Sequence, residues 1–178
     1  MLAGHSSRRI GGFTLVELMI SVAIFGIVLA LAMPGFNVWM QNTQIRTATE
    51  SLQNGLQMAR AEAVRRNEKV RFDLGTGTSW IVSTDAGTQL QSRSSSEGSK
   101  NVILSVTPTG AARVTFNSLG RVVANTDGSA SFTQINVDVP TTVISASQSR
   151  DLRVLVTAGG NIRTCDPSIT VAGDPRMC

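Results

Sequence analysis

Residues 13–33 read FTLVELMISVAIFGIVLALAM and form the most apolar stretch of the 178-residue chain. They carry a single charge, Glu17. A helix rises about 1.5 Å per residue, so a helix of this length spans a hydrocarbon core of about 30 Å. The stretch therefore predicts one membrane-spanning helix near the N-terminus.

The residues on either side of this stretch indicate its orientation. Arg8 and Arg9 precede it, with no acidic residue among them. Positive charge keeps that end in the cytoplasm and sends the C-terminal part outward. An ordinary secretory signal has a shorter apolar region with a small-residue cleavage site after it, whereas the pair Gly11-Gly12 comes before the run. A carboxylate inside a membrane helix costs about 2.5–3.5 kcal/mol on insertion scales, so Glu17 indicates a function.

The hexapeptide GFTLVE at 12–17, followed by the apolar run and Pro34, resembles the class III signal of type IV pilins and type II secretion pseudopilins. The resemblance implies that a prepilin peptidase cuts between Gly12 and Phe13 and that Phe13 is then N-methylated. It also implies that Glu17 pairs with the N-terminal amine of a neighbouring subunit. Such a pair would offset the cost of both charges in lipid. The alternative is a simple signal anchor with a chance glutamate.

Beyond the apolar run, Pro34-Gly35 would normally kink or interrupt a helix. Apolar residues then recur at spacings of three or four, which defines one helical face. We therefore expect one helix over about 13–66, whose second half lays an apolar stripe on a domain core. The stripe consists of Ile45, Ala48, Leu52, Leu56, Ala59 and Ala63.

After residue 67 the pattern becomes short, β-branched and often alternating, with turn residues between the segments. The expected strands are 69–74, 80–84, 101–107, 112–116, 132–139 and 152–157, and the Ser-rich segment 91–100 is expected to be a mobile loop. The prediction is an α+β fold, with the long N-terminal helix packed on an antiparallel β-sheet domain. The expected segments are a cleaved leader (1–12), a transmembrane helix (13–34), its amphipathic continuation (35–66) and a β-rich domain (67–178).

The two cysteines, Cys165 and Cys178, enclose a turn-rich segment at the C-terminus. We expect a disulfide that closes this loop, which is worth about 3 kcal/mol in the chain-entropy model. Such a bond indicates an oxidising compartment. The alternative is a pair of free thiols in the cytosol.

Three further segments resemble the H-type pseudopilins and the FimT/FimU-type minor pilins. They are the helix end at 57–67, the strand and turn VTFNSLGR at 114–121, and the tail with RTCDP at 163–167 and RMC at 176–178. The tail resembles the minor pilins more than a pseudopilin. The resemblance covers nearly the whole chain and is weakest over 75–100.

The sequence offers little for catalysis. The only histidine is His5, in the expected leader, and no phosphate-loop motif or metal-ligand cluster is present. Asp166 and Asp174 suit turns better than a calcium site. We predict a protein that is not an enzyme and needs no cofactor or metal.

The resemblance implies a minor type IV pilin, anchored in the inner membrane with a periplasmic domain, that primes pilus assembly and sits at or near the filament tip. Its expected partners are the prepilin peptidase and other minor and major pilins. One alternative is a minor pseudopilin of type II secretion.

The other alternative is a DNA-binding minor pilin for natural competence. Some FimT-like pilins bind DNA through a Gly-Arg-x-Arg pattern, which here reads Gly160-Asn161-Ile162-Arg163 and lacks the first arginine. The candidate DNA-binding residues are Arg163, Arg176, Arg153 and Arg150. Net charge adds little, because without the leader 14 basic residues face 12 acidic ones.

Overall fold

The computed structural model describes residues 12–178, except for the Pro34 side chain. The features predicted within residues 1–11, including His5, Arg8, Arg9 and Gly11, lie outside the described residues. The chain divides into two compact units, Met1–Asn37 and Val38–Cys178, and each is described by itself.

One helix, α1, runs from Leu15 to Arg66 over 52 residues, so the single long helix is confirmed. Its C-terminal end has a defined stop. Asn67 adopts a positive φ of 54°, the amide of Glu68 donates to the carbonyl of Ala63 at 3.3 Å, and the Asn67 amide donates to Val64 at 3.3 Å. These two bonds form a Schellman motif, in which a left-handed residue turns the chain away from the helix axis.

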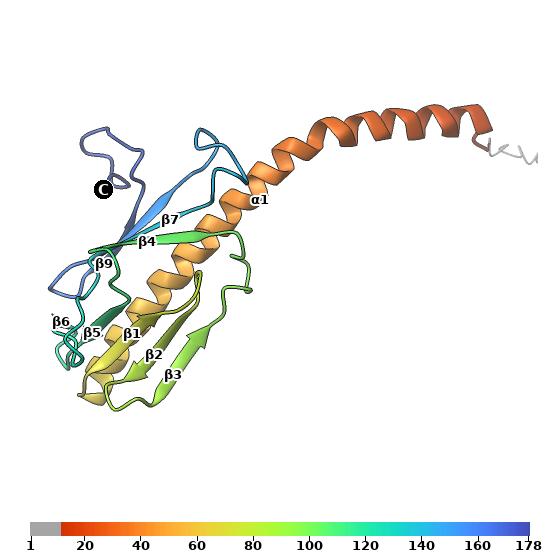
Figure 1. Ribbon diagram of the computed structural model, residues 1–178. Coiled ribbons are helices and arrows are strands. Elements are labelled where there is room, and N and C mark those ends of the chain that lie inside the picture. Colours follow the sequence, from red (N-terminus) through yellow and green to blue (C-terminus); the bar gives the residue numbers. More distant parts are fainter. Residues whose placement is uncertain (1–11) are drawn as a thin grey trace, which may run out of the picture. The chain divides into compact units, whose positions relative to one another are not determined.

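The β-rich unit contains two antiparallel sheets (Figure 1). The five-stranded sheet has the order β3-β2-β1-β5-β6, and the four-stranded sheet the order β4-β7-β8-β9. The strands are β1 (Val70–Leu74), β2 (Trp80–Thr84), β3 (Gln89–Arg93), β4 (Ile103–Thr107), β5 (Arg113–Phe116), β6 (Val122–Val123), β7 (Gln134–Asp138), β8 (Leu152–Val156) and β9 (Ile162–Cys165). The prediction of a loop over 91–100 was wrong at its start, because residues 91–93 belong to β3.

A single hydrophobic core joins the second half of α1 to both sheets. The six residues of the predicted stripe are at most 1% exposed, so its assignment to the core is confirmed. Phe72 stacks on Trp80 with ring centroids 5.6 Å apart and meets Phe132 edge-on at 6.2 Å. The indole Nε1 of Trp80 donates to Ser51 Oγ of α1 at 2.8 Å, which satisfies the one polar atom of that ring. Each fully buried large side chain contributes about 1.5–3 kcal/mol to folding.

Two glycine turns meet beside the C-terminal part of α1. Gly120 and Gly160 have φ of 71° and 80°, and a Cβ built on Gly160 would lie 1.8 Å from the Gly120 carbonyl oxygen. Arg60 Nε of α1 donates to that same carbonyl at 3.2 Å. Glycine is therefore required at 160 for space as well as for backbone conformation. This junction fixes where β9 begins and so where Arg163 lies.

Candidate functional site

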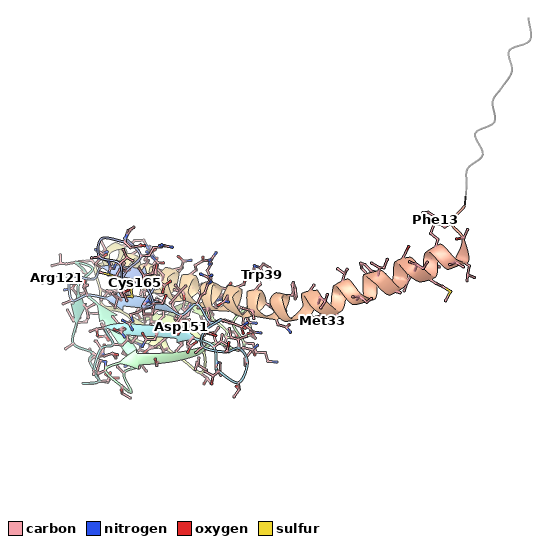
Figure 2. The ribbon with its side chains drawn as sticks, turned by 90° about the horizontal axis from the view of Figure 1, so that it is seen from above. Phe13, Met33, Trp39, Arg121, Asp151 and Cys165 are labelled. Atoms are coloured by element: carbon pink, nitrogen blue, oxygen red, sulfur yellow. A yellow bond between two sulfur atoms is a disulfide. The ribbon has the colours of Figure 1, made fainter. Side chains whose placement is uncertain are left out.

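The predicted cleavage and assembly residues lie at the start of α1, with Phe13 two residues before the helix and Glu17 in its first turn. Thr14 caps the helix, because its Oγ1 accepts the Glu17 amide at 3.2 Å and its carbonyl accepts the Leu18 amide at 3.1 Å. Glu17 lies in the first turn, where a negative charge is favoured by the helix dipole. Phe13 directly precedes the cap and is 83% exposed (Figure 2).

The Thr14 cap was not identified from the sequence, although its signal is present. Threonine followed three residues later by glutamate, ahead of an apolar run, is the capping-box pattern. The Glu17 side chain makes no hydrogen bond or ion pair with any residue from 12 to 178. Its carboxylate is therefore available to a group outside the described chain.

The first part of α1 is apolar and exposed along its whole length. Leu15–Met33 has a mean hydropathy of 2.6 and is, by length and composition, able to cross a membrane. Every residue from 12 to 33 is exposed. Soluble proteins rarely leave an apolar surface of this size uncovered, so it marks a surface for lipid or for other helices.

Two of the four arginines proposed for DNA share one face of the four-stranded sheet. Strand pairing sets Arg153 opposite Cys165 and Leu155 opposite Arg163, so Arg153 and Arg163 project from the same face of the four-stranded sheet. Arg153 Nε donates to Asn136 Oδ1 at 2.7 Å on that face. Arg163 is exposed, and its side chain has no hydrogen bond or ion pair among the described residues.

The other two arginines lie outside the strands of this sheet. Arg176 pairs with Asp174 at 2.9 Å inside the C-terminal tail, and these hydrogen bonds hold the pKa of Asp174 below its ordinary value. The Arg150 amide donates to Asn42 Oδ1 of α1 at 2.8 Å, in the loop before β8. The sequence grouped the four arginines as one candidate site only because they lie near one another along the chain.

The tail is closed by a disulfide between Cys165 and Cys178, as predicted, with Cα atoms 5.1 Å apart. Asp166 Oδ1 accepts the Ser168 amide at 2.9 Å, and Asp174 Oδ1 accepts the Arg176 amide at 2.8 Å. Both carboxylates therefore organise turns, as the sequence indicated. Over residues 12–178 no group of three His, Cys, Asp or Glu side chains could hold a metal ion.

An acidic pair lies at one end of the four-stranded sheet. The Ser149 hydroxyl contacts Asp138 Oδ1 at 3.1 Å and Asp151 Oδ1 at 2.6 Å. Burial raises the pKa of Asp151, and the neighbouring Asp138 raises it further. A hydroxyl has one proton to donate, so the two carboxylates compete for it.

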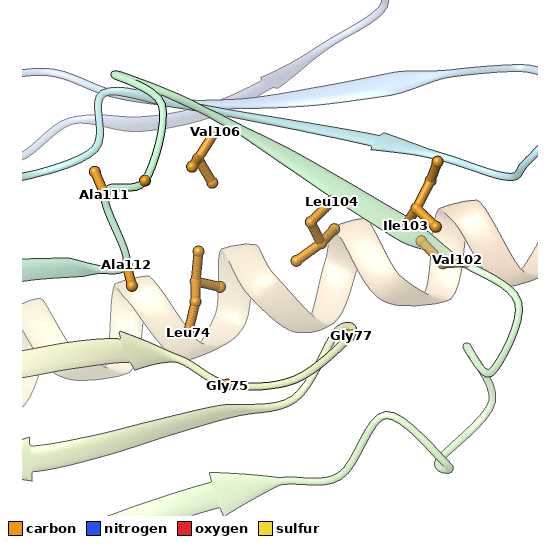
Figure 3. Close-up of a pocket in the computed structure, with 10 residues that line it drawn as sticks. Leu74, Gly75, Gly77, Val102, Ile103, Leu104, Val106, Ala111 and Ala112 are labelled. Atoms are coloured by element: carbon orange, nitrogen blue, oxygen red, sulfur yellow. The ribbon is translucent and has the colours of Figure 1, made fainter.

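The domain also contains a groove of about 460 Å³. Leu74 of β1 faces Leu104 and Val106 of β4 across it (Figure 3). Its ten lining residues are aliphatic residues and glycines, without a titratable or nucleophilic side chain. The groove therefore offers no acid, base or metal ligand for catalysis.

Comparison with known families gives two matches. Residues 48–160 match the family described as type II transport protein GspH, and residues 7–33 match the prokaryotic N-terminal methylation motif. The second match includes Gly12, Phe13 and Glu17. Together the matches cover both the exposed apolar helix and most of the domain.

Curated relatives are fimbrial proteins. The chain is 38% identical over 76 residues to the type IV major fimbrial protein FimA of Dichelobacter nodosus, which is 43% of this chain and 47% of that protein. It is 28% identical over 101 residues to a fimbrial protein of Pseudomonas aeruginosa, covering 52% of this chain and 65% of the relative. The chain thus spans less than two thirds of the length of these relatives.

Among solved structures, the type IV minor pilin FimU of Pseudomonas aeruginosa superposes with a TM-score of 0.53. The superposition covers 75% of this chain and 97% of FimU at 15% sequence identity. At that identity the likeness concerns the fold alone, and it confirms the α+β, pilin-like architecture.

Proposed function

Because the chain belongs to the family of the type II transport protein GspH, which groups minor pilins and pseudopilins, we propose that it is a minor type IV pilin that primes pilus assembly and remains at or near the filament tip. Proteins of this family are structural subunits rather than enzymes. We propose that the chain crosses the inner membrane once, with the domain in the periplasm.

One observation carries this proposal. Glu17 lies in the first turn of α1, within its exposed apolar part and four residues after Phe13. Cleavage between Gly12 and Phe13 would place a new amine at that depth. An amine and a carboxylate in an apolar surrounding are each costly alone, and pairing between neighbouring subunits removes much of that cost. The pair would also fix the axial register of one helix against the next.

Two measurements test the proposal. Intact-mass analysis of the mature chain should show loss of residues 1–12 and gain of one methyl group, and an unprocessed N-terminus would contradict it. Glu17→Ala should leave membrane insertion intact and strongly reduce incorporation into filaments. Glu17→Asp, which keeps the charge but shortens the side chain, should retain part of the incorporation. Normal incorporation of the alanine variant would refute the charge pair.

The disulfide-closed tail favours a pilus subunit over a type II secretion pseudopilin. A pilus subunit and a pseudopilin have the same kind of anchor helix, so the anchor does not distinguish between the two assignments. Deleting the gene in a strain with both systems should reduce piliation and leave secretion of exoproteins unchanged. Loss of secretion with normal piliation would assign the chain to the pseudopilus.

DNA binding is a second candidate, favoured by Arg163, which is exposed, has no side-chain partner among residues 12–178, and shares a face with Arg153. With Arg176 held by Asp174, few phosphate contacts are available, so we expect weak and strongly salt-dependent binding. Titration of the chain with double-stranded DNA at low and moderate salt, beside Arg163→Ala, tests it. Absence of binding at low salt would exclude this role.

A further inference from the structure

Two loops of the domain are hydrogen-bonded to the same turn of α1, residues 41–44. Asn42 Nδ2 donates to the Gln148 carbonyl at 2.9 Å, and its Oδ1 accepts the Arg150 amide at 2.8 Å. On the other side, Asn101 donates through its amide to Gln44 Oε1 and through Nδ2 to Gln41 Oε1, both at 3.1 Å. These bonds hold the chain at Lys100 and at Arg150 against residues 41–44 of the helix.

Three basic residues therefore lie at this level of the domain: Arg46 on α1, and Lys100 and Arg150 on the two loops. We call these three residues the basic collar. All three are exposed. Arg46 follows Asn42 by four residues and so lies on the helix face that binds the Arg150 loop. Within residues 12–178, none of the three side chains has a hydrogen bond or an ion pair. Six other arginines of the domain are engaged by carboxylates, namely Arg65, Arg66, Arg71, Arg93, Arg113 and Arg176.

The anions near the collar do not neutralise it. Asp151 is half-buried and engaged with Asp138 and Ser149. Glu97 pairs with Arg93 at 3.6 Å. Glu50 is exposed four residues after Arg46 and forms no ion pair with it within residues 12–178. The exposed tips of the collar are therefore positively charged.

The sequence position of the collar points to its partner. The apolar span ends at Met33, and Gln41 follows eight residues later, or about 12 Å of helix. The headgroup layer adds about 5–8 Å on each side of the hydrocarbon, and charges act over about 8 Å at physiological salt. Trp39, six residues after Met33, is 62% exposed, and tryptophan is enriched at the boundary between lipid and water. Chain connectivity thus keeps the loops that carry Lys100 and Arg150 within electrostatic reach of a bilayer that holds the span, whereas Arg46, thirteen residues or about 20 Å of helix after Met33, lies at the edge of that reach.

We propose that Arg46, Lys100 and Arg150 form a docking surface for the anionic headgroups of that bilayer. The inference rests on the membrane anchoring proposed above. Docking holds the domain on the membrane before the subunit enters a filament, and extraction into the filament then has to break these contacts. Lipid charge would thereby set how readily the subunit leaves the membrane.

The experiment uses the full chain in nanodiscs that hold one molecule each, which excludes contacts between subunits. A fluorophore on Ala146→Cys, an exposed residue of the Arg150 loop, reports energy transfer to acceptors on lipid headgroups. Transfer should be higher with phosphatidylglycerol mixed into phosphatidylcholine than with phosphatidylcholine alone, and high salt should remove the difference. Each basic residue near an anionic surface changes the ratio of docked to undocked molecules about fivefold.

The matched variants each remove one lysine and one arginine. The double variant Lys100→Gln, Arg150→Gln should lose most of the lipid dependence. The control double variant Lys69→Gln, Arg121→Gln should keep it; the side chains of Lys69 and Arg121 are also exposed and have no partner among residues 12–178. Equal transfer in both lipids, or equal loss in both double variants, would overturn the proposal. A response seen only when several molecules share a liposome would assign the collar to an acidic protein surface instead. Failure of the chain to remain in the nanodisc would refute the anchoring itself, which is a separate result.

Discussion

Helix α1 consists of two halves that use apolar residues in opposite ways. From Leu15 to Met33 none of the apolar side chains is buried within the described chain. From Ile45 to Ala63 the same kind of residue recurs every three or four positions and is almost fully buried. The second half thus has its packing partner within the chain, in the two sheets. The first half requires a partner from outside, either lipid or the helices of other subunits.

The largest expected difference between the halves concerns leucine. Leu52→Ala should lower the free energy of unfolding of the domain by about 2–5 kcal/mol, because it leaves a cavity in the core. Leu31 is 78% exposed, so Leu31→Ala should lower the free energy of unfolding of the domain by no more than about 0.5 kcal/mol. Denaturant unfolding of the chain in mild detergent, followed by the fluorescence of the buried Trp80, measures both. Equal losses would show that the apolar half also supports the domain.

Glycine gives a second and smaller contrast. A Cβ on Gly55 would lie 2.7 Å from a ring carbon of Phe72 and 3.0 Å from the Trp80 ring, whereas a Cβ on Gly26 meets nothing within 4 Å. Gly55→Ala should therefore destabilise the domain by about 1–3 kcal/mol through overpacking. Gly26→Ala should leave domain stability unchanged. The same unfolding assay measures both variants. A Gly55→Ala variant more stable than the wild type would mean that the rings of Phe72 and Trp80 shift at little cost in free energy.

Much of this helix could be predicted from the sequence, because local sequence patterns identify both halves. Apolar length identifies the first half, and a period near 3.6 identifies the second. Six strands were also predictable from β-branched runs. By contrast, three strands were missed: β3 is the polar sequence QLQSR at a sheet edge, mostly exposed, β6 has only two residues, and β9 has four. Such short or polar segments have no apolar alternation to detect.

The arrangement of the strands and of the candidate site was less predictable. Division into two sheets depends on pairings between segments far apart in the chain, such as β4 with β7. The arginines show the same limit. Strand register sets Arg153 and Arg163 on one face, while a local ion pair with Asp174 engages Arg176. The basic collar joins residues 46, 100 and 150 through three amide side chains of the helix, which no local pattern reveals.

The smallest predicted effect compares the carboxylates at the two ends of α1. Glu17 lacks a partner among residues 12–178, whereas hydrogen bonds from Arg65 and then Arg66 lower the pKa of Glu62 from 4.5 to about 2. The lowered pKa means that folding favours the ionised carboxylate of Glu62. The contribution of this carboxylate to the free energy of unfolding is therefore complete above a pH of about 4.5 and is lost as the pH falls toward 2. Glu62→Gln should cost about 0.3–1 kcal/mol at neutral pH, as is usual for exposed ion pairs.

Unfolding curves of both forms between neutral pH and pH 3 test this prediction. The difference in free energy of unfolding between the wild-type chain and Glu62→Gln should shrink steadily as the solution becomes more acidic. In an Arg65→Gln, Arg66→Gln background the same substitution should have almost no effect, because the groups that stabilise the carboxylate are gone. A difference that persists at low pH, or in that background, would mean that Glu62 acts through helix packing rather than charge.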